Sequence, residues 1–304
     1  MPSHHGVGDK TGRSFPNETL RLLIERSTCR SFEDKKIPPD VLNLILESGI
    51  HAATGGNLQP YSILKIENQA TKDKLTKLVG NQPFVSTAPV DLLFCIDYHR
   101  LERWAKLEKA PYAARSSFRH FWIGFQDTII TAQSICTAAD ALDLGSVYIG
   151  TVLECFRELR AMFELPDGVF PVVLLCLGYP KVRPEPRKKL DVPVMVHDEK
   201  YRDPTDDDLL AAFEQKYPGW KKDITDERLE TIAQVCRDVH GDAFADGCLS
   251  NISEQGHIKA AQNYFGLHYV ANGMAANNDE FMAIMEEFGC HCFKKFEPKN
   301  TNGE

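Results

Sequence analysis

The feature that most constrains the fold is a pair of short, uninterrupted apolar runs at residues 90–96 and 169–178. Both are much shorter than the roughly 20 apolar residues of a membrane-spanning helix. Runs of this length are typical of strands that are buried on both faces. Residues 61–66 and 145–150 add two further strand patterns, and helical patterns alternate irregularly with all four. The sequence therefore predicts an α+β fold with a mixed central β-sheet flanked by helices.

A long helical pattern covers residues 118–142. Its apolar side chains recur on all sides of the helix, which predicts a helix that is nearly fully buried. Such a helix suits the core of a dimer as well as the core of a monomer.

Bulk properties exclude some classes of protein. The chain has 304 residues and a formal net charge of -8, which is unfavourable for nucleic-acid binding because phosphates need a basic surface. No run of 18 apolar residues and no apolar leader segment occurs, so neither membrane insertion nor export is expected. Several of the nine cysteines lie inside apolar runs, as Cys95 and Cys176 do, which indicates buried thiols and a cytoplasmic location.

Composition divides the chain into three parts. Residues 1–16 are polar and rich in Gly and His, and are predicted to be a disordered tail. Residues 17–205 hold all the strand patterns and are predicted to form the core domain. Residues 206–304 show helical patterns and no strong strand, and are predicted to form a C-terminal helical extension.

Three segments carry groups that suit a phosphate or a planar heterocycle. Residues 26–32 offer two guanidinium groups and three hydroxyls, although basic residues also commonly end a helix. Residues 54–60 combine glycines, which permit close backbone approach, with amide side chains, although this is also the composition of a simple turn. Residues 187–189 are basic and lie in a proline-rich loop, although a run of charges in a loop is usually just exposed to solvent and binds nothing.

Taken together and in this order, the segments resemble the FMN-dependent nitroreductase family. The resemblance is strongest to the subfamily of oxygen-insensitive NADPH nitroreductases and flavin reductases, and it covers roughly residues 17–202. The matching stretches are RSTCRSF, TGGNLQP, GNQPFV followed by APVDLLFCID, LGSVYIGT followed by VVLLCLGYP, and PEPRKKLDVPVMVHDEKY.

The resemblance implies FMN as the cofactor and a homodimer with two flavins at the subunit interface and an extended C-terminal arm. It implies no catalytic side chain, because the flavin N5 carries the chemistry, and it places Arg30 at the N1/O2 edge of the ring to polarise it. No metal ligands are assigned. The residues that it places on the cofactor are Arg26, Ser27, Thr28, Arg30, Thr54, Gly55, Gly56, Asn57, Gln59, Gln82, Gly150, Thr151, Arg187 and Lys189.

The implied reaction passes electrons from NAD(P)H to nitroaromatics, quinones or flavins, so the acceptor is a small aromatic or quinone, and the kinetics are ping-pong. The choice between NADH and NADPH stays open, because the segment after residue 202 is acidic where NADPH-specific members are basic. Thr151 also departs from the family, which has a second glycine there.

Two alternatives remain at this stage. The last hundred residues hold Cys236, Cys248, Cys290 and Cys292 together with His240, His257 and His291. These residues would suit a zinc or iron–sulfur site, or else the cysteines are buried or idle thiols in an arm that wraps a partner. A metal site there would favour a flavin- or metal-binding redox sensor. A dehalogenase-type member of the same fold is the other alternative.

Overall fold

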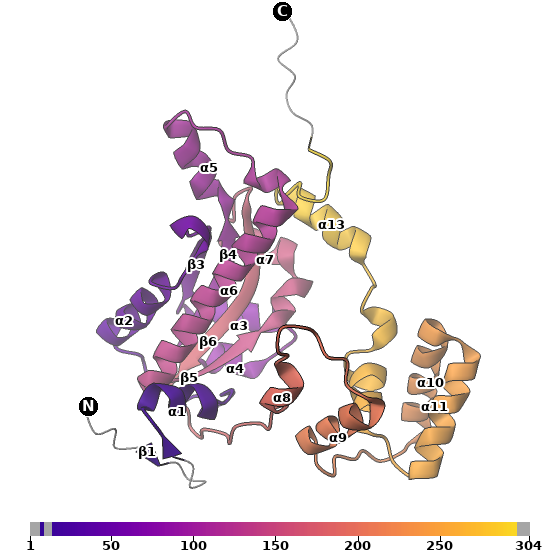
Figure 1. The fold of residues 1–304 in the computed structure, drawn as a ribbon. Coiled ribbons are helices and arrows are strands. Elements are labelled where there is room, and N and C mark those ends of the chain that lie inside the picture. The colour runs from indigo at the N-terminus through magenta and orange to yellow at the C-terminus, as the bar shows by residue number, and fades with distance from the viewer. Residues whose placement is uncertain (1–6, 9–13, 297–304) are drawn as a thin grey trace, which may run out of the picture. The chain divides into compact units, whose positions relative to one another are not determined.

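The computed structural model describes residues 7–8 and 14–296. The chain forms two compact units: the first unit comprises residues 1–186 and 280–304, and the second unit comprises residues 187–279 (Figure 1). The second unit begins at residue 187, whereas the sequence analysis places a domain boundary at residue 206. Residues 280–304 belong to the first unit and not to the C-terminal extension. Much of the predicted tail, residues 1–6 and 9–13, lies outside the described residues.

The first unit contains a sheet of four strands in the order β3-β4-β6-β5. The two apolar runs are its inner strands, β4 and β6, and every residue of both is buried. All the pairings within this sheet are antiparallel, with a bulge between Phe94 and Cys95. Within residues 14–296, parallel pairing is limited to an isolated bridge between Thr28 and Ser146. The α+β class is confirmed, although the sheet is more uniformly antiparallel than the sequence predicts. The strands of this sheet are β3 Tyr61–Ile66, β4 Val90–Asp97, β5 Gly145–Ile149 and β6 Val169–Gly178. The strands β1 Val7–Gly8 and β2 Ser14–Phe15 pair with each other in a separate sheet.

Helices surround this sheet, and the longest is α6 (Phe118–Ala141), which packs on β4, β5 and β6 and is itself flanked by α1 and α2. The prediction that α6 is nearly fully buried is wrong in this chain: Trp122, Phe125 and Ile130 are 57%, 43% and 44% exposed. The sheet, α1 and α2 cover part of α6, and these three side chains lie on the part that they leave exposed. The other helices of this unit are α1 Glu18–Glu25, α2 Pro39–Ile50, η1 Gly55–Asn57, α3 Gln69–Leu78, α4 Pro83–Thr87, α5 Tyr98–Leu107, η2 Ala114–Ser116, η3 Gly150–Glu154 and α7 Phe156–Phe163.

The end of the chain returns to the first unit through α13 (Asn278–Glu287). Phe288 is fully buried, and its ring centroid lies 5.4 Å from that of Phe170 on β6. Arg157 on α7 donates to Glu287 at 2.8 Å and to Glu280 at 3.0 Å. Aromatic packing and ion pairs therefore fasten this segment to the core.

The second unit is helical. Its small core consists of Ile232, Ile252 and Ile258. Among the described residues, none of the helices is long and apolar enough to cross a membrane. The elements of this unit are α8 Val192–Met195, α9 Asp206–Lys216, α10 Asp226–His240, α11 Asp242–Gln255, α12 Ala260–Asn263, η4 Tyr264–His268 and η5 Ala271–Gly273.

Candidate functional site

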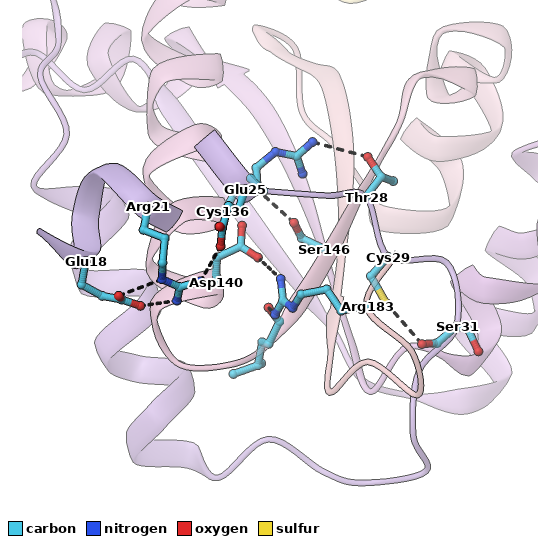
Figure 2. Close-up of polar contacts among 12 residues, drawn as sticks. Glu18, Arg21, Glu25, Thr28, Cys29, Ser31, Cys136, Asp140, Ser146 and Arg183 are labelled. Carbon is cyan, nitrogen blue, oxygen red and sulfur yellow. Dashed lines mark hydrogen bonds and ion pairs between the residues drawn. The ribbon is translucent and has the colours of Figure 1, made fainter. Parts of the chain in front are cut away.

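The segment that follows α1 runs beside β5. The Cys29 N–H donates to the Ser146 carbonyl at 2.9 Å, and Thr28 forms a parallel bridge with Ser146. A Cβ on Gly145 would lie 2.5 Å from the Cys29 Cβ, so only glycine lets the two backbones approach this closely. The segment is thus fixed as an additional strand-like edge next to β5, and Arg26 Nη2 lies 3.4 Å from Thr28 Oγ1 (Figure 2).

A buried carboxylate supports this segment. Asp140 near the end of α6 accepts from Arg183 Nη1 at 2.7 Å, and Arg183 Nη2 donates to the Leu144 carbonyl at 2.8 Å (Figure 2). Burial raises the pKa of Asp140, whereas the positive charges of Arg183 and Arg26 lower it. Because a buried carboxylate needs compensating charge, Asp140 is stabilised by its ion pair with Arg183.

Gln82 and Thr151 meet at the far end of β5. Gln82 Nε2 donates to the Val79 carbonyl at 2.7 Å and to Thr151 Oγ1 at 3.0 Å, and the Thr151 hydroxyl donates to the same carbonyl at 2.9 Å. Thr151 therefore uses its hydroxyl to orient Gln82. Next to it, a Cβ on Gly150 would meet no heavy atom within 4 Å.

The loop Thr54–Gln59 is held by two residues that sequence reasoning did not assign to it. The Gly55 N–H donates to both carboxylate oxygens of Asp127 on α6, at 3.1 Å each. Arg100 on α5 donates to the Gln59 carbonyl at 2.6 Å. Gly56, Asn57 and Gln59 have φ values of 60°, 56° and 50°. A non-glycine residue with positive φ is uncommon, and such residues cluster in functional loops.

The candidate residues fall into three groups, two of them in the first unit and the third in the second unit. The β5-edge group consists of Arg26, Ser27, Thr28, Arg30, Gln82, Gly150 and Thr151, and the β3-edge group consists of Thr54, Gly55, Gly56, Asn57 and Gln59. These groups lie at opposite edges of the sheet, roughly 14 Å apart over three strand spacings. Arg187 and Lys189, the third group, belong to the second unit and are exposed.

Two hydroxyls in these groups are buried without a hydrogen-bond partner among the described residues, Ser27 Oγ and Thr54 Oγ1. An unpaired buried hydroxyl costs on the order of 1–3 kcal/mol. One of them lies in each edge group, and Arg30 beside the first is exposed. Both edge groups therefore carry polar atoms that a bound polar ligand would satisfy.

A pocket of about 600 Å³ adjoins the β3-edge group, with Gly55 and Leu58 on one side. Tyr98, Tyr112 and His120 also line it, and we call it the tyrosine pocket. Burial raises the pKa of Tyr112 to about 12, so both its hydroxyl and that of Tyr98, whose pKa burial also raises, stay protonated near neutral pH. The pocket thus offers apolar walls with neutral hydrogen-bonding groups, which suit a small aromatic molecule.

The C-terminal cysteines are divided between the two units. Cys290 and Cys292 are buried in the first unit, whereas Cys236 and Cys248 lie in the second. Among the described residues, no group of three or more Cys, His, Asp or Glu could hold a metal ion.

Sequence reasoning missed Asp127, Asp140 and Arg183. A signal for the first two was available, because each is an acidic residue inside a helical pattern that is otherwise apolar, where an unpaired carboxylate would be costly. Their partners, a backbone N–H and an arginine 43 residues away, follow only from the fold.

The fold and these edge groups define an α+β protein with cation- and hydroxyl-rich segments beside an antiparallel sheet. The model of the nitroreductase family matches residues 23–179, and the chain belongs to this family. Membership confirms the family that the motifs predict and makes the chain an oxidoreductase of a flavin-dependent family.

Three relatives illustrate the match. The oxygen-insensitive NADPH nitroreductase of Salmonella typhimurium is 30% identical over 65% of this chain and 80% of its own length. The FMN reductase (NAD(P)H) of Bacillus subtilis is 29% identical over 70% of this chain and 84% of its own. The structure of a putative oxidoreductase from Bacteroides fragilis has a TM-score of 0.73 at 25% identity, and the match covers 88% of this chain and 98% of that one.

Proposed function

We propose that this chain is an NAD(P)H-dependent FMN oxidoreductase that reduces nitroaromatics, quinones or flavins with ping-pong kinetics. The observation that carries the proposal is the β5-edge group, in which Arg26 and Thr28 flank the buried and unpaired hydroxyl of Ser27. The names of the relatives, an NADPH nitroreductase and an FMN reductase, agree with this chemistry.

FMN fits the residues that are present. Its phosphate and ribityl chain need cations and hydroxyl partners, and Arg26, Ser27 and Thr28 supply them. Its ring needs close backbone approach, which Gly150 permits because nothing stands where its Cβ would be. Thr54 Oγ1 offers a second unsatisfied polar atom at the other edge group.

When bound, FMN supplies two-electron chemistry at N5, and the protein positions and polarises it. We assign Arg30 to the N1/O2 edge, where a fixed positive charge stabilises the anionic reduced ring. Gln82 is oriented for the ring by Thr151 and the Val79 carbonyl. Arg187 and Lys189 are assigned to the FMN phosphate by the resemblance, and this assignment stays a prediction.

We further propose a homodimer in which each site is completed by a second copy. We infer that the β5-edge and β3-edge groups of one chain lie too far apart to contact the same flavin ring. In a dimer, the β3-edge group of a second copy would complete the site that the β5-edge group begins. The outer face of α6 supports this, because Trp122, Phe125 and Ile130 form exposed apolar surface there, and such surface marks interaction sites. Leu44 on α2 and Leu23 on α1 extend it, at 54% and 51% exposed.

We assign the acceptor to the tyrosine pocket, because its walls are apolar and the lining residues Gly55 and Leu58 belong to the loop proposed for the ring. A single pocket that donor and acceptor use in turn is the basis for the ping-pong order. The donor is NADH or NADPH, and the location that we propose is the cytoplasm.

The pigment of the purified protein tests the cofactor. We expect a yellow protein that releases FMN on acid treatment, and apoprotein that rebinds FMN more tightly than riboflavin, which lacks the phosphate. Arg26→Ala should weaken FMN binding at least tenfold, because a charge-assisted hydrogen bond contributes about 1.5–3 kcal/mol. Arg21→Ala is the matched control, because the ion pairs that Arg21 makes within the described part of the chain are with Glu18 and Glu25, close to it in sequence. A colourless protein that does not take up FMN would sink the proposal.

A further inference from the structure

The second unit contains a pocket that none of the candidate flavin residues lines. Its first two walls are α10 and α11, which form a helical hairpin that turns at Gly241, where φ is 85°. Residues 261–274 supply the third wall, and we call the space between them the hairpin pocket. Its volume is about 700 Å³, within the range of roughly 300–1,000 Å³ that is usual for small-molecule sites.

Apolar side chains dominate the lining of the hairpin pocket. Val239, Phe244, Phe265 and Met274 line it and are 42%, 54%, 54% and 59% exposed. Large apolar groups are seldom left this accessible on several converging elements unless they contact something. Three walls from one unit line the space, which is a concave, half-open pocket rather than a flat surface.

The charge of an occupant follows from the polar groups in the lining. Among the lining residues that the structure describes, none is Lys, Arg, Asp or Glu. The Asn251 side-chain oxygen already accepts from Gln255 and Gln262, at 2.8 and 3.1 Å, so its NH₂ group and the His240 ring remain for hydrogen bonding. A carboxylate or ammonium would lose hydration there without gaining a counter-ion. The lining therefore favours a neutral molecule.

Two thiols complete the lining. Of the nine cysteines only Cys236 and Cys248 are partly exposed, and both line this pocket. Burial and the neighbouring Cys236 thiol raise the pKa of Cys248 to about 11. Near neutral pH this thiol is uncharged and behaves as an apolar group.

We propose that the hairpin pocket is a binding site for a neutral, mostly apolar aromatic molecule. Phe244 and Phe265 contact its rings, and the Asn251 amide and the His240 ring meet its polar end. None of the proposed flavin residues lines this pocket, and the proposal does not depend on flavin chemistry.

Two probes with the same ring system but different charge test the proposal. N-phenyl-1-naphthylamine is neutral, whereas 1-anilinonaphthalene-8-sulfonate carries one negative charge. Titrated into FMN-saturated protein, the neutral probe should bind at least tenfold more tightly than the sulfonate, because the sulfonate would have to be desolvated without a cation.

A pocket-filling variant locates the binding. Gly247 lies on α11 and lines the pocket, and a Cβ there would meet no heavy atom within 4 Å. Gly247→Leu should therefore fold and fill the pocket, and should weaken binding of the neutral probe at least tenfold. Gly273→Leu is the matched control, because Gly273 has equally open surroundings but does not line the pocket.

Three results would overturn the proposal. The first is equal binding of the two probes, and the second is unchanged binding of the neutral probe to Gly247→Leu. The third is a wild-type protein that ignores the neutral probe while Gly247→Leu changes the sedimentation coefficient, which would make the pocket a contact between copies. Failure of the FMN proposal would show instead as a colourless protein, so the two failures are distinguishable.

Discussion

We predict that Asp91 makes the free energy of unfolding fall as the pH rises. Asp91 lies near the start of the inner strand β4 with none of its surface exposed, and neither carboxylate oxygen has a hydrogen-bond partner among the described residues. Burial raises its pKa from 3.8 to about 7, although the Cys176 thiol and the Lys72 ammonium oppose the shift. The folded protein therefore holds a proton on Asp91 at a pH where the unfolded chain has lost it.

The sign of the effect follows from proton binding. Between pH 3.8 and 7 the native state binds more protons at this site, so the free energy of unfolding decreases with pH and levels off above pH 7. From pH 5 to pH 8 the loss is roughly 2.5 kcal/mol, at 1.36 kcal/mol for each pKa unit. The Asp91→Asn variant carries no ionisable group there and should lack this loss.

Urea denaturation at pH 5, 6, 7 and 8 measures the effect, with FMN at one fixed concentration throughout. Relative to wild type, Asp91→Asn should gain roughly 2.5 kcal/mol in unfolding free energy as the pH goes from 5 to 8. Asp73→Asn is the control, because Asp73 is exposed and its pKa is lowered by Ser86 and Gln69. A difference between Asp91→Asn and wild type that stays constant across these pH values would refute the reasoning.

Three further outcomes are expected. Asp127→Ala removes both acceptors of the Gly55 N–H. It should cost about 1.5 kcal/mol and so weaken FMN binding about tenfold in a fluorescence titration. An unchanged affinity would show that residues 54–59 do not contribute to FMN binding. Gly145→Val should lower the unfolding free energy by about 3 kcal/mol in urea, because its Cβ would lie 2.5 Å from the Cys29 Cβ, whereas Gly150→Ala should be nearly neutral. Trp122→Glu places a charge on the exposed face of α6 and should shift the protein to monomers in sedimentation velocity; an unshifted profile would exclude this face as the dimer contact.

The strands of the sheet were predictable because their signals are local. The pattern at residues 61–66 coincides with β3, and the run at 169–178 coincides with β6. Antiparallel pairing was not predictable, since it depends on how the connections cross the sheet. The helix α11 and the return of α13 to the first unit were also missed, because glycines and mixed polarity weaken their helical patterns and the Phe288 contacts are long-range.

The candidate site was predictable in its parts and not in its assembly. The motifs single out residues on both edges of the sheet, yet nothing local to Arg26 or Gly55 indicates that three strand spacings separate them. The exposed face of α6 explains the error about its burial, because a helix that is apolar all round is equally compatible with a monomer core and with a subunit contact.

Anaerobic titration of the purified, FMN-saturated protein with NADH and with NADPH tests the central claim most directly. We predict that at least one nicotinamide bleaches the visible flavin absorbance with a stoichiometry of one per FMN, and that a quinone added afterwards, with no nicotinamide left, restores it. Flavin absorbance that neither nicotinamide bleaches would contradict the account.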